Sequence, residues 1–261
     1  MIHVPALQAD LADTVFAGKV HFSPVTESTN TDALEAARAG APHGSVYLAN
    51  EQSAGRGRAA NAWQSAAGEG LYVSVLLRPP MQASQIHLLP LAAGLAAAQA
   101  IHAVAGLTVD LRWPNDLLIG QRKTGGILVE SKTEASQVAF AVVGIGINVH
   151  QRSFAPGLST PATSLDVETS RRISRNLLLV SLLKSLQRET QALLDSAACE
   201  TLLERMAQSS TWLRGRPVQV HGPQACIGVT AGLDQHGFLL VRTDSALVTV
   251  RTGGIRAAEI S

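Results

Sequence analysis

The segments Gly126-Ile-Leu-Val-Glu-Ser131 and Val138-Ala-Phe-Ala-Val-Val-Gly-Ile-Gly-Ile-Asn148 are two apolar runs that are typical of paired β-strands. The second run contains two glycines and ends in a single amide side chain, that of Asn148. Glycine inside a strand often marks the close approach of a ligand or of another backbone. The pair therefore predicts a sheet with a binding surface near the end of one strand. A buried strand that ends in an asparagine turn stays open as the alternative for this segment taken alone.

Further strands and helices are expected on both sides of this pair. Strands are expected at 45–49, 71–77 and 108–112, and helices within 27–40, 84–104, 171–194 and 199–206. In the first helix, Thr29 and Asp32 have the spacing of a capping box. In the second, Pro90 favours a late start, because proline is tolerated only in the first turn of a helix.

The spacing of apolar residues and glycines changes after Trp212. Four short apolar runs at 217–221, 225–229, 238–242 and 246–251 are separated by turns that contain glycine. Short strands at this spacing predict a small β-barrel or sandwich. We therefore expect two domains, residues 1–212 and residues 213–261.

The composition excludes several classes of protein. Hydrophobic residues make up 46% of the chain and charged residues 16%, so a disordered chain is not expected. The net charge of +1 does not favour nucleic-acid binding by overall electrostatics. The apolar stretch from Leu88 to Leu107 contains Pro90, Gln99 and His102, and a buried helix fits it better than a membrane span.

Cysteine and histidine usage points to a reduced compartment and to chemistry without a bound transition metal. Cys199 and Cys226 are far apart and form neither a disulfide framework nor a zinc site. The eight histidines lack the HExxH spacing of catalytic zinc proteins. The N-terminus has no basic region before an apolar run and does not resemble a signal peptide. We expect a cytoplasmic protein with no tightly bound prosthetic group.

The loop Gln52-Ser-Ala-Gly-Arg-Gly-Arg58, followed by Trp63, is the first candidate for chemistry. Glycine lets the backbone approach a ligand closely, and arginine carries forked donors that suit phosphate and carboxylate oxygens. A surface turn with two solvated arginines is an equally good interpretation of this loop alone. The loop also matches the dinucleotide pattern GxGxxA from Gly55 to Ala60, but no acid lies about 20 residues further on, so an NAD-binding protein is disfavoured.

The second candidate is Arg112-Trp-Pro-Asn-Asp116, followed by Lys123-Thr-Gly-Gly-Ile127. A rigid turn places Asn115 beside Asp116, and a lysine can contact a carboxylate and a phosphate together. Asp116 could hold Mg²⁺, which prefers carboxylate and phosphate oxygens. A hairpin turn with a surface lysine is the alternative.

Taken in order, these motifs resemble the catalytic domain of biotin–protein ligases. The resemblance rests on Glu27-Ser-Thr-Asn30, the Gly-Arg-Gly-Arg loop, Trp-Pro-Asn-Asp with Lys123, and Gly-Ile-Asn148, and it spans about residues 22–150. The segment from Arg216 to Ile255 resembles the small SH3-like C-terminal domain of that family. The resemblance implies an α/β (α+β) fold with a mixed sheet, related to class II aminoacyl-tRNA synthetases and lipoate ligases, followed by an SH3-like β-barrel.

The resemblance also implies a two-step reaction and a set of site residues. Biotin and ATP would form biotinyl-5′-AMP, and a lysine of a biotin carboxyl carrier protein would then take the biotinyl group. The implied catalytic residues are Lys123 and Arg58. The implied biotin-binding residues are Ser28, Thr29, Asn30, Gln52, Arg56, Gly57, Arg58, Lys123 and Gly126. The implied nucleotide-binding residues are Arg56, Arg58, Trp63, Asn115, Asp116, Lys123 and Asn148, with Mg²⁺ assigned to Asp116.

The chain differs from the usual family sequence at two places, and we expect it to lack a domain that some family members have. The family usually has lysine where this chain has Arg112, and further basic residues where it has Ala59 to Ala62. About twenty residues precede the first motif, too few for the winged helix-turn-helix of bifunctional members, so we expect no specific DNA binding. Neither a membrane partner nor a fixed oligomeric state is implied, although edge strands could pair two copies into a homodimer. The alternatives are a lipoate or octanoate ligase of the same superfold and a non-catalytic biotin-binding regulator.

Overall fold

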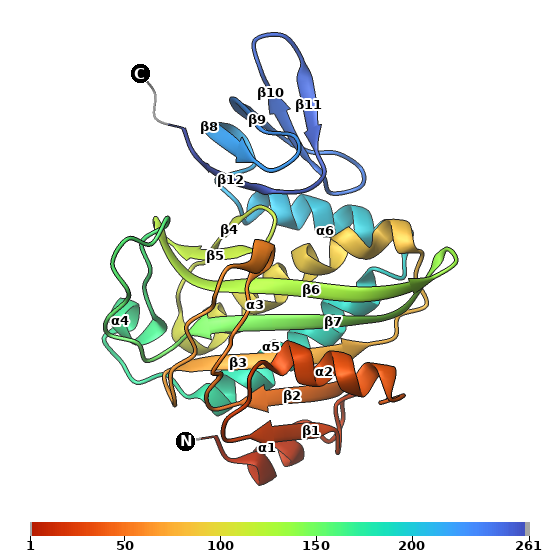
Figure 1. Cartoon of the computed structure of the whole chain (residues 1–261), viewed down its shortest axis with the longest axis vertical. Coiled ribbons are helices and arrows are strands. Elements are labelled where there is room, and N and C mark those ends of the chain that lie inside the picture. Colours follow the sequence, from red (N-terminus) through yellow and green to blue (C-terminus); the bar gives the residue numbers. More distant parts are fainter. Residues whose placement is uncertain (1, 259–261) are drawn as a thin grey trace.

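The computed structural model describes residues 2–258 and contains two β-sheets (Figure 1). The larger sheet has seven strands in the order β1-β2-β3-β7-β6-β5-β4. These strands are β1 (Val20–Ser23), β2 (Ser45–Ala49), β3 (Gly70–Leu77), β4 (Asp110–Arg112), β5 (Asp116–Ile119), β6 (Arg122–Glu134) and β7 (Gln137–Asn148). β1 and β2 run parallel, and the other neighbouring strands run antiparallel. The expectation of a mixed sheet is therefore confirmed.

The predicted strand pair forms the β6–β7 hairpin at the centre of this sheet. Gly126 pairs with Gly146, and the ladder continues to the turn beyond Glu134. On its other side, β7 pairs with β3 along all eight residues of β3, and every residue of β3 is buried. An apolar strand with neighbours on both edges and both faces has this pattern of burial. The hairpin thus fixes the part of the sheet on which the site is built.

Helices cover both faces of the larger sheet (Figure 1). α3 (Leu89–Ala105) and α5 (Arg175–Ala192) pack against each other and lie on one face, whereas α2 (Thr29–Arg38) lies on the other. α2 packs Ala33 and Ala37 onto the side chains of Leu76, Phe140 and Val142. The remaining helices are α1 (Val4–Asp10), α4 (Leu165–Thr169), α6 (Ser196–Gln208) and the 3-10 turns η1 (Arg58–Ala60) and η2 (Ala83–Leu88). Small alanines let α2 lie close to the sheet.

The most apolar segment of the chain is a core helix in this structure. Residues 83–105 are long and apolar enough to cross a membrane by length and composition, but 67% of the most apolar window is buried within the fold. Pro90 lies in the first turn of α3, after the 3-10 turn η2, so the predicted late start is confirmed. Gly106 ends α3 in the left-handed conformation at φ 72°.

The predicted capping box at the start of α2 is wrong. The N-cap is Ser28, and its side chain makes no capping hydrogen bond. The Thr29 hydroxyl instead hydrogen-bonds Gln52 at 3.1 Å and the Ser74 hydroxyl at 2.8 Å, while Asp32 accepts from Thr26 at 3.0 Å. The polar residues at this helix start are committed to tertiary contacts and not to capping.

The second sheet is antiparallel and has the strand order β11-β10-β9-β8-β12. Its strands are β8 (Arg214–His221), β9 (Cys226–Leu233), β10 (Leu239–Arg242), β11 (Leu247–Val250) and β12 (Gly254–Ala257). This small antiparallel sheet agrees with the expected SH3-like module. It contacts the larger domain at Gly237, whose carbonyl accepts from the Trp113 indole at 3.2 Å, and at Phe238, which stacks on His87 at 4.3 Å.

A buried carboxylate, that of Glu189, joins three helices behind the sheet. Glu189 lies in α5, and its side chain is 1% exposed. It accepts two hydrogen bonds from Arg205 of α6, at 2.8 and 2.7 Å, and one from Gln99 of α3 at 2.9 Å. Burial by itself raises the pKa of Glu189, but the Arg205 and Gln99 hydrogen bonds outweigh it and hold the pKa below the ordinary 4.5. The folded state therefore keeps this carboxylate ionised.

Glu189→Gln should destabilise the fold and change how stability depends on pH. We expect the free energy of unfolding at pH 7 to fall by about 1–3 kcal/mol, because the variant removes the buried charged acceptor of the Arg205 and Gln99 donors. The pKa of Glu189 is lower in the folded state, so its contribution is present above pH 4.5 and is lost as the pH falls below that value. Urea unfolding between pH 3 and 7 measures both effects. The exposed Glu204→Gln on α6 is the control, and equal pH profiles for wild type and Glu189→Gln would contradict the prediction.

Candidate active site

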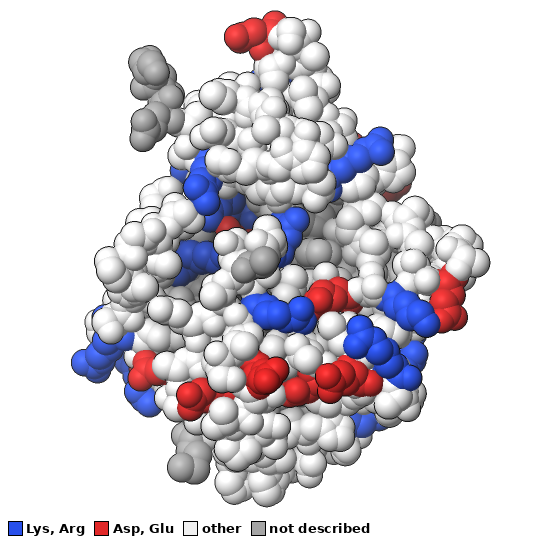
Figure 2. Space-filling model, viewed as in Figure 1, with Lys and Arg blue, Asp and Glu red and all other residues white. Residues whose placement is uncertain are grey.

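A cavity of about 990 Å³ lies where the start of α2, the loop after β2, the β6–β7 hairpin and the C-terminal sheet meet. Its size is at the upper end of the range for small-molecule sites, so it has room for more than one ligand. Figure 2 shows Lys and Arg side chains gathered on this face, where the C-terminal lobe meets the larger one. Every residue of the predicted site lines this cavity: Ser28, Thr29, Asn30, Gln52, Arg56, Gly57, Arg58, Trp63, Asn115, Asp116, Lys123, Gly126 and Asn148.

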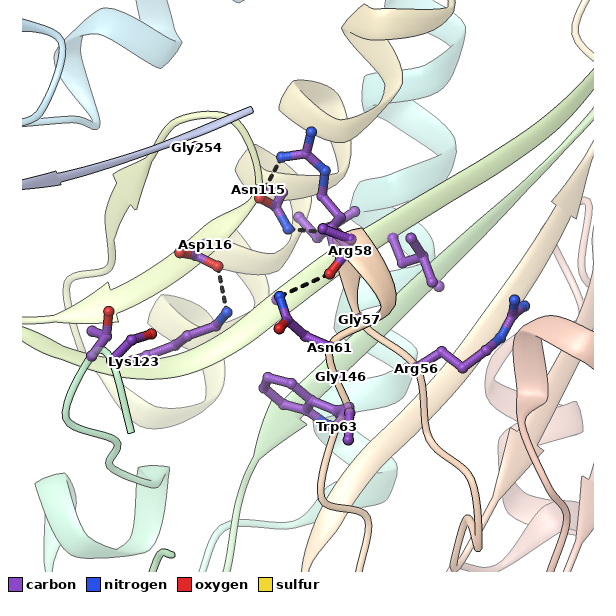
Figure 3. A pocket seen from close by; sticks show the side chains of 18 of the residues that line it. Arg56, Gly57, Arg58, Asn61, Trp63, Asn115, Asp116, Lys123, Gly146 and Gly254 are labelled. Atoms are coloured by element: carbon purple, nitrogen blue, oxygen red, sulfur yellow. Dashed lines mark hydrogen bonds and ion pairs between the residues drawn. The ribbon is translucent and has the colours of Figure 1, made fainter. Parts of the chain in front are cut away.

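The Gly-Arg-Gly-Arg loop forms a narrow hairpin at the cavity wall. The Trp63 amide donates to the Gly55 carbonyl at 2.8 Å, and the Gly57 amide donates to the Asn61 carbonyl at 2.7 Å. A Cβ on Gly55 would lie 2.4 Å from the Trp63 carbonyl oxygen, so only glycine fits there. Arg56 and Arg58 extend in different directions from this hairpin, Arg58 toward Asn115 and Arg56 away from it (Figure 3). The two arginines therefore serve different parts of the site.

One end of the cavity is a connected set of buried polar groups. The Gln52 amide oxygen accepts from the Thr29 backbone N–H at 2.9 Å, and the Gln52 NH₂ donates to Ser65 at 2.7 Å. The Ser74 hydroxyl joins Thr29 to Asn30, with its bond to the Asn30 amide oxygen at 2.5 Å. Each side chain is fixed by its neighbour, as recognition of a small polar ring requires.

Gly144 and Gly146 of β7 make room for two of these side chains. A Cβ on Gly144 would lie 2.0 Å from the Asn30 amide oxygen, and a Cβ on Gly146 would lie 2.6 Å from the Trp63 indole nitrogen. The sequence predicted that glycine marks the approach of a ligand or of another backbone. In the structure, side chains that line the cavity make the approach. Asn30 and Trp63 thus pack directly against the backbone of β7.

Lys123 stands at the other end of the cavity, within a cluster of charges (Figure 3). Its Nζ lies 2.5 Å from one oxygen of Asp116 and 5.5 Å from the centre of the Trp63 ring. Arg112 contacts the other Asp116 oxygen at 2.6 Å. Burial raises the pKa of Asp116, but Lys123 and Arg112 together outweigh it, and the net pKa is lowered. Asp116 therefore remains a carboxylate that holds Lys123 in place.

The residues around Asp116 do not fit a magnesium site in this arrangement. Both carboxylate oxygens are already paired with cations, one with Lys123 and the other with Arg112. Among residues 2–258, no group of three or more His, Cys, Asp or Glu side chains could hold a metal ion. The assignment of Mg²⁺ to Asp116 stays a prediction, because both oxygens of that carboxylate already have cationic partners.

Arg58 links the site to the C-terminal sheet. Its guanidinium donates to the Asn115 amide oxygen at 3.2 Å and to the Gly253 carbonyl at 2.9 Å. The Asn115 amide in turn donates to the Ile127 carbonyl at 2.8 Å. Burial lowers the pKa of Arg58, while the Asp116 carboxylate opposes that shift. The second catalytic residue expected from sequence thus lies between the two sheets.

Arg56 and Asn148 line the cavity, and each bonds a protein partner there. Arg56 forms an ion pair with Glu130 at 2.7 Å, and its side chain is 41% exposed. It lies at the rim and not against Lys123 (Figure 3). Asn148 is buried, and its amide donates to the Thr163 carbonyl at 3.0 Å. A contact of either residue with the nucleotide stays a prediction.

Three buried polar atoms in the cavity wall have no hydrogen-bond partner among the described residues: the Trp63 indole nitrogen, a Gln151 amide oxygen and a His221 ring nitrogen. Such atoms are rare in folded proteins and are costly unless a ligand or water completes them. All three residues belong to the wall of one cavity.

Sequence reasoning missed two groups of wall residues and two hydrogen-bond partners of the wall residue Asn30. Ser74 and Glu130 lie on strands that were predicted only as apolar runs, and each bonds Asn30. The loop after β7 contributes Phe154, Leu158 and Thr160. The C-terminal module contributes His221, Gly222, Pro223, Thr252, Gly253, Gly254, Ile255 and Arg256. The Gly253-Gly254 pair was the one local signal for that last group.

Comparison with known proteins agrees with this geometry. Residues 22–148 match the model of the Biotin/lipoate A/B protein ligase family. The chain is 33% identical to the biotin–[acetyl-CoA-carboxylase] ligase of Paracoccus denitrificans over 83% of this chain and 91% of that protein. It is 32% identical to the bifunctional ligase/repressor BirA of Bacillus subtilis over 90% of this chain and 72% of that protein.

A solved structure with ligands is also similar. The biotin protein ligase of Aquifex aeolicus, in complex with biotin and ATP, superposes with a TM-score of 0.79 and 26% identity, covering 92% of this chain and 98% of that one. The similarity therefore covers both sheets and not the catalytic motifs alone. With this fold, this cavity and these relatives, the chain belongs to the biotin/lipoate A/B protein ligase family.

Proposed function

We propose that this protein is an ATP-dependent biotin–protein ligase that forms biotinyl-5′-AMP and transfers biotin to a lysine of a biotin carboxyl carrier protein. The observation that carries the proposal is the polarity of the cavity. A fixed set of neutral hydrogen-bonding groups lies at one end, and Lys123 lies at the other. Biotin has the matching form, with a neutral polar ring at one end and a carboxylate at the other.

The first step brings two anions together. The biotin carboxylate attacks the α-phosphorus of ATP, the bond to the β-phosphate oxygen breaks, and pyrophosphate leaves. Ser28, Thr29, Asn30 and Gln52 would hold the ring. Lys123 and Arg58 would offset the repulsion and stabilise the charge that develops on the phosphoryl oxygens. Asp116 and the Trp63 ring would hold the Lys123 ammonium within the cavity, where it can reach the substrate.

The second step needs no protein nucleophile. The amine of the carrier lysine attacks the carbonyl carbon of the mixed anhydride, and AMP leaves with the bonding electron pair. Trp63, Gly57 and Gly126 would enclose the adenylate, since all three line the cavity and Gly126 leaves space beside the indole ring. Exclusion of water by these walls would protect the anhydride from hydrolysis.

Biotin is favoured over lipoate as the substrate by the relatives. The Paracoccus and Aquifex proteins carry biotin in their names, and the chain keeps both Gly-Arg-Gly-Arg and Trp-Pro-Asn-Asp. The polar groups at the ring end favour a ureido ring, which offers donors and an acceptor, over a plain dithiolane. We further propose that the carrier belongs to a biotin-dependent carboxylase and that the reaction takes place in the cytoplasm.

Lys123→Gln should abolish most of the activity. We expect biotinylation of an apo carrier domain, with biotin, ATP and magnesium supplied, to slow by about 100-fold or more, because a charge that stabilises the transition state is lost. Intact-mass spectrometry of the carrier measures the reaction. Lys132→Gln is the matched control, since Lys132 lies on the same strand and is 58% exposed. A wild-type mass gain with lipoate and none with biotin would contradict the proposed substrate.

Gly146→Ala should weaken nucleotide binding more than biotin binding. The added Cβ would lie 2.6 Å from the Trp63 indole nitrogen, so the ring must shift. If Trp63 covers the adenylate, we expect the KM for ATP to rise about tenfold and the KM for biotin to change less. Pyrophosphate release measures both. Gly94→Ala in α3, where the new Cβ meets ordinary contacts at 3.6 Å, is the control. An unchanged KM for ATP would remove Trp63 from the nucleotide site.

A further inference from the structure

Trp212 lies at the junction of the two sheets, two residues before β8. Its side chain is buried at 2% exposure, and its indole N–H has no hydrogen-bond partner within residues 2–258. The ring instead contacts two guanidinium groups. The Arg216 carbon Cζ lies 3.7 Å from the ring centre, and that of Arg112 lies 5.1 Å away. Apolar packing in the core and cation–ring contacts, and not a hydrogen bond from the indole N–H, therefore hold this side chain.

The contact on the Arg112 side leads directly to the candidate active site. Arg112 donates to Asp116 through Nε at 3.1 Å and Nη2 at 2.6 Å, and Asp116 holds Lys123. Nη2 of Arg112 also donates to Thr160 at 2.9 Å, in the loop that follows β7. A guanidinium packed against an aromatic ring keeps its hydrogen-bonding edge free. Trp212 thus supports Arg112 while the edge of Arg112 holds Asp116.

The contact on the Arg216 side leads to the same lysine by a second route. Arg216 donates to Gln121 at 3.0 Å. Gln121 lies in the turn between β5 and β6, two residues before Lys123. The segment before Trp212 is also tied to β4, because the Thr211 N–H and hydroxyl both donate to Asp110, at 2.9 and 2.6 Å. The junction is therefore attached to β4, which pairs with the strand of Asp116, and to the turn that precedes Lys123.

We propose that Trp212 and Arg216 are positioning residues for Lys123, so that the C-terminal module helps to set the geometry of the first reaction step. The inference rests on the proposed role of Lys123. Two cations, Arg112 and Lys123, share the carboxylate of Asp116, while Arg112 and Arg216 both contact the electron-rich ring of Trp212, which offsets part of the repulsion between the two guanidinium groups. Without that support, Arg112 shifts and Asp116 holds Lys123 in a different place.

Steady-state pyrophosphate release by the full chain tests the proposal. Arg216→Met keeps the packing of the side chain but removes its charge. We expect it to lower kcat by about 10- to 100-fold, as small displacements of a reacting group do, with the KM for biotin within about twofold of wild type. The KM for biotin should change little because the groups proposed to bind the biotin ring, near Asn30 and Gln52, are held by bonds to Ser74 and Thr29 and not by Trp212 or Arg216. Arg242→Met is the matched control, an exposed arginine of the same sheet.

Substitution of the ring itself separates positioning from simple stability. Trp212→Phe keeps an aromatic face and should retain most of kcat, whereas Trp212→Leu should lose as much as Arg216→Met. Thermal melting and circular dichroism confirm that each variant is folded under the assay conditions. Equal losses in the folded Phe and Leu variants would overturn the proposal. So would a fall in kcat no larger than the loss of folded protein, because a smaller folded fraction lowers the apparent kcat and leaves KM unchanged.

The wild-type enzyme separates this inference from the proposed function. A folded wild type that releases no pyrophosphate with either biotin or lipoate removes the proposed function, and the inference with it. An active wild type, together with an Arg216→Met variant of undiminished kcat, removes the inference alone.

Discussion

The absence of side chains at Gly144 and Gly146 is the constraint on which the site depends. β7 lies in the middle of the larger sheet, paired with β3 and β6 along most of its length. Any Cβ at these two positions would overlap Asn30 or Trp63. The bare stretch of β7 thus lets α2 and the Gly-Arg-Gly-Arg hairpin approach from different parts of the chain. The apolar residues on either side of the glycines bury the strand, so the sheet gives a firm floor to a polar cavity.

The charges at the far end of the cavity follow from the same construction. A short β4–β5 turn and the β5–β6 turn bring Arg112, Asp116 and Lys123 together within one edge of the sheet. One carboxylate between two cations leaves a net positive charge, which suits a site for carboxylate and phosphate groups. The usual lysine of the family is replaced here by Arg112, and arginine alone can both stack on Trp212 and donate twice to Asp116. The substitution thus fits the geometry of this chain.

The sequence predicted what depends on local patterns. The β6–β7 hairpin, the core helix α3 and the short strands after Trp212 all have the periodicity or turn signals that the structure confirms. The capping box failed because Thr29 and Asp32 are used by tertiary partners, Gln52 and Ser74 for the first and Thr26 for the second. Spacing along a helix carries no information about such partners. Glu130 was missed for a related reason, since one acid in an apolar strand has no local signature.

The contribution of the C-terminal module to the cavity was beyond reach of a sequence argument, because it depends on how the two sheets dock. Gly237 fits between Leu88, Leu91 and Leu203, and its backbone at φ 83° would strain any other residue. That close contact sets the position of the second sheet, and from it the Gly253 carbonyl reaches Arg58. Stabilising the fold would require only the contact of Gly237 with the three leucines of the larger domain. The second contact places the backbone of the module against Arg58 in the cavity wall, so the docking of the module also sets the geometry of the cavity.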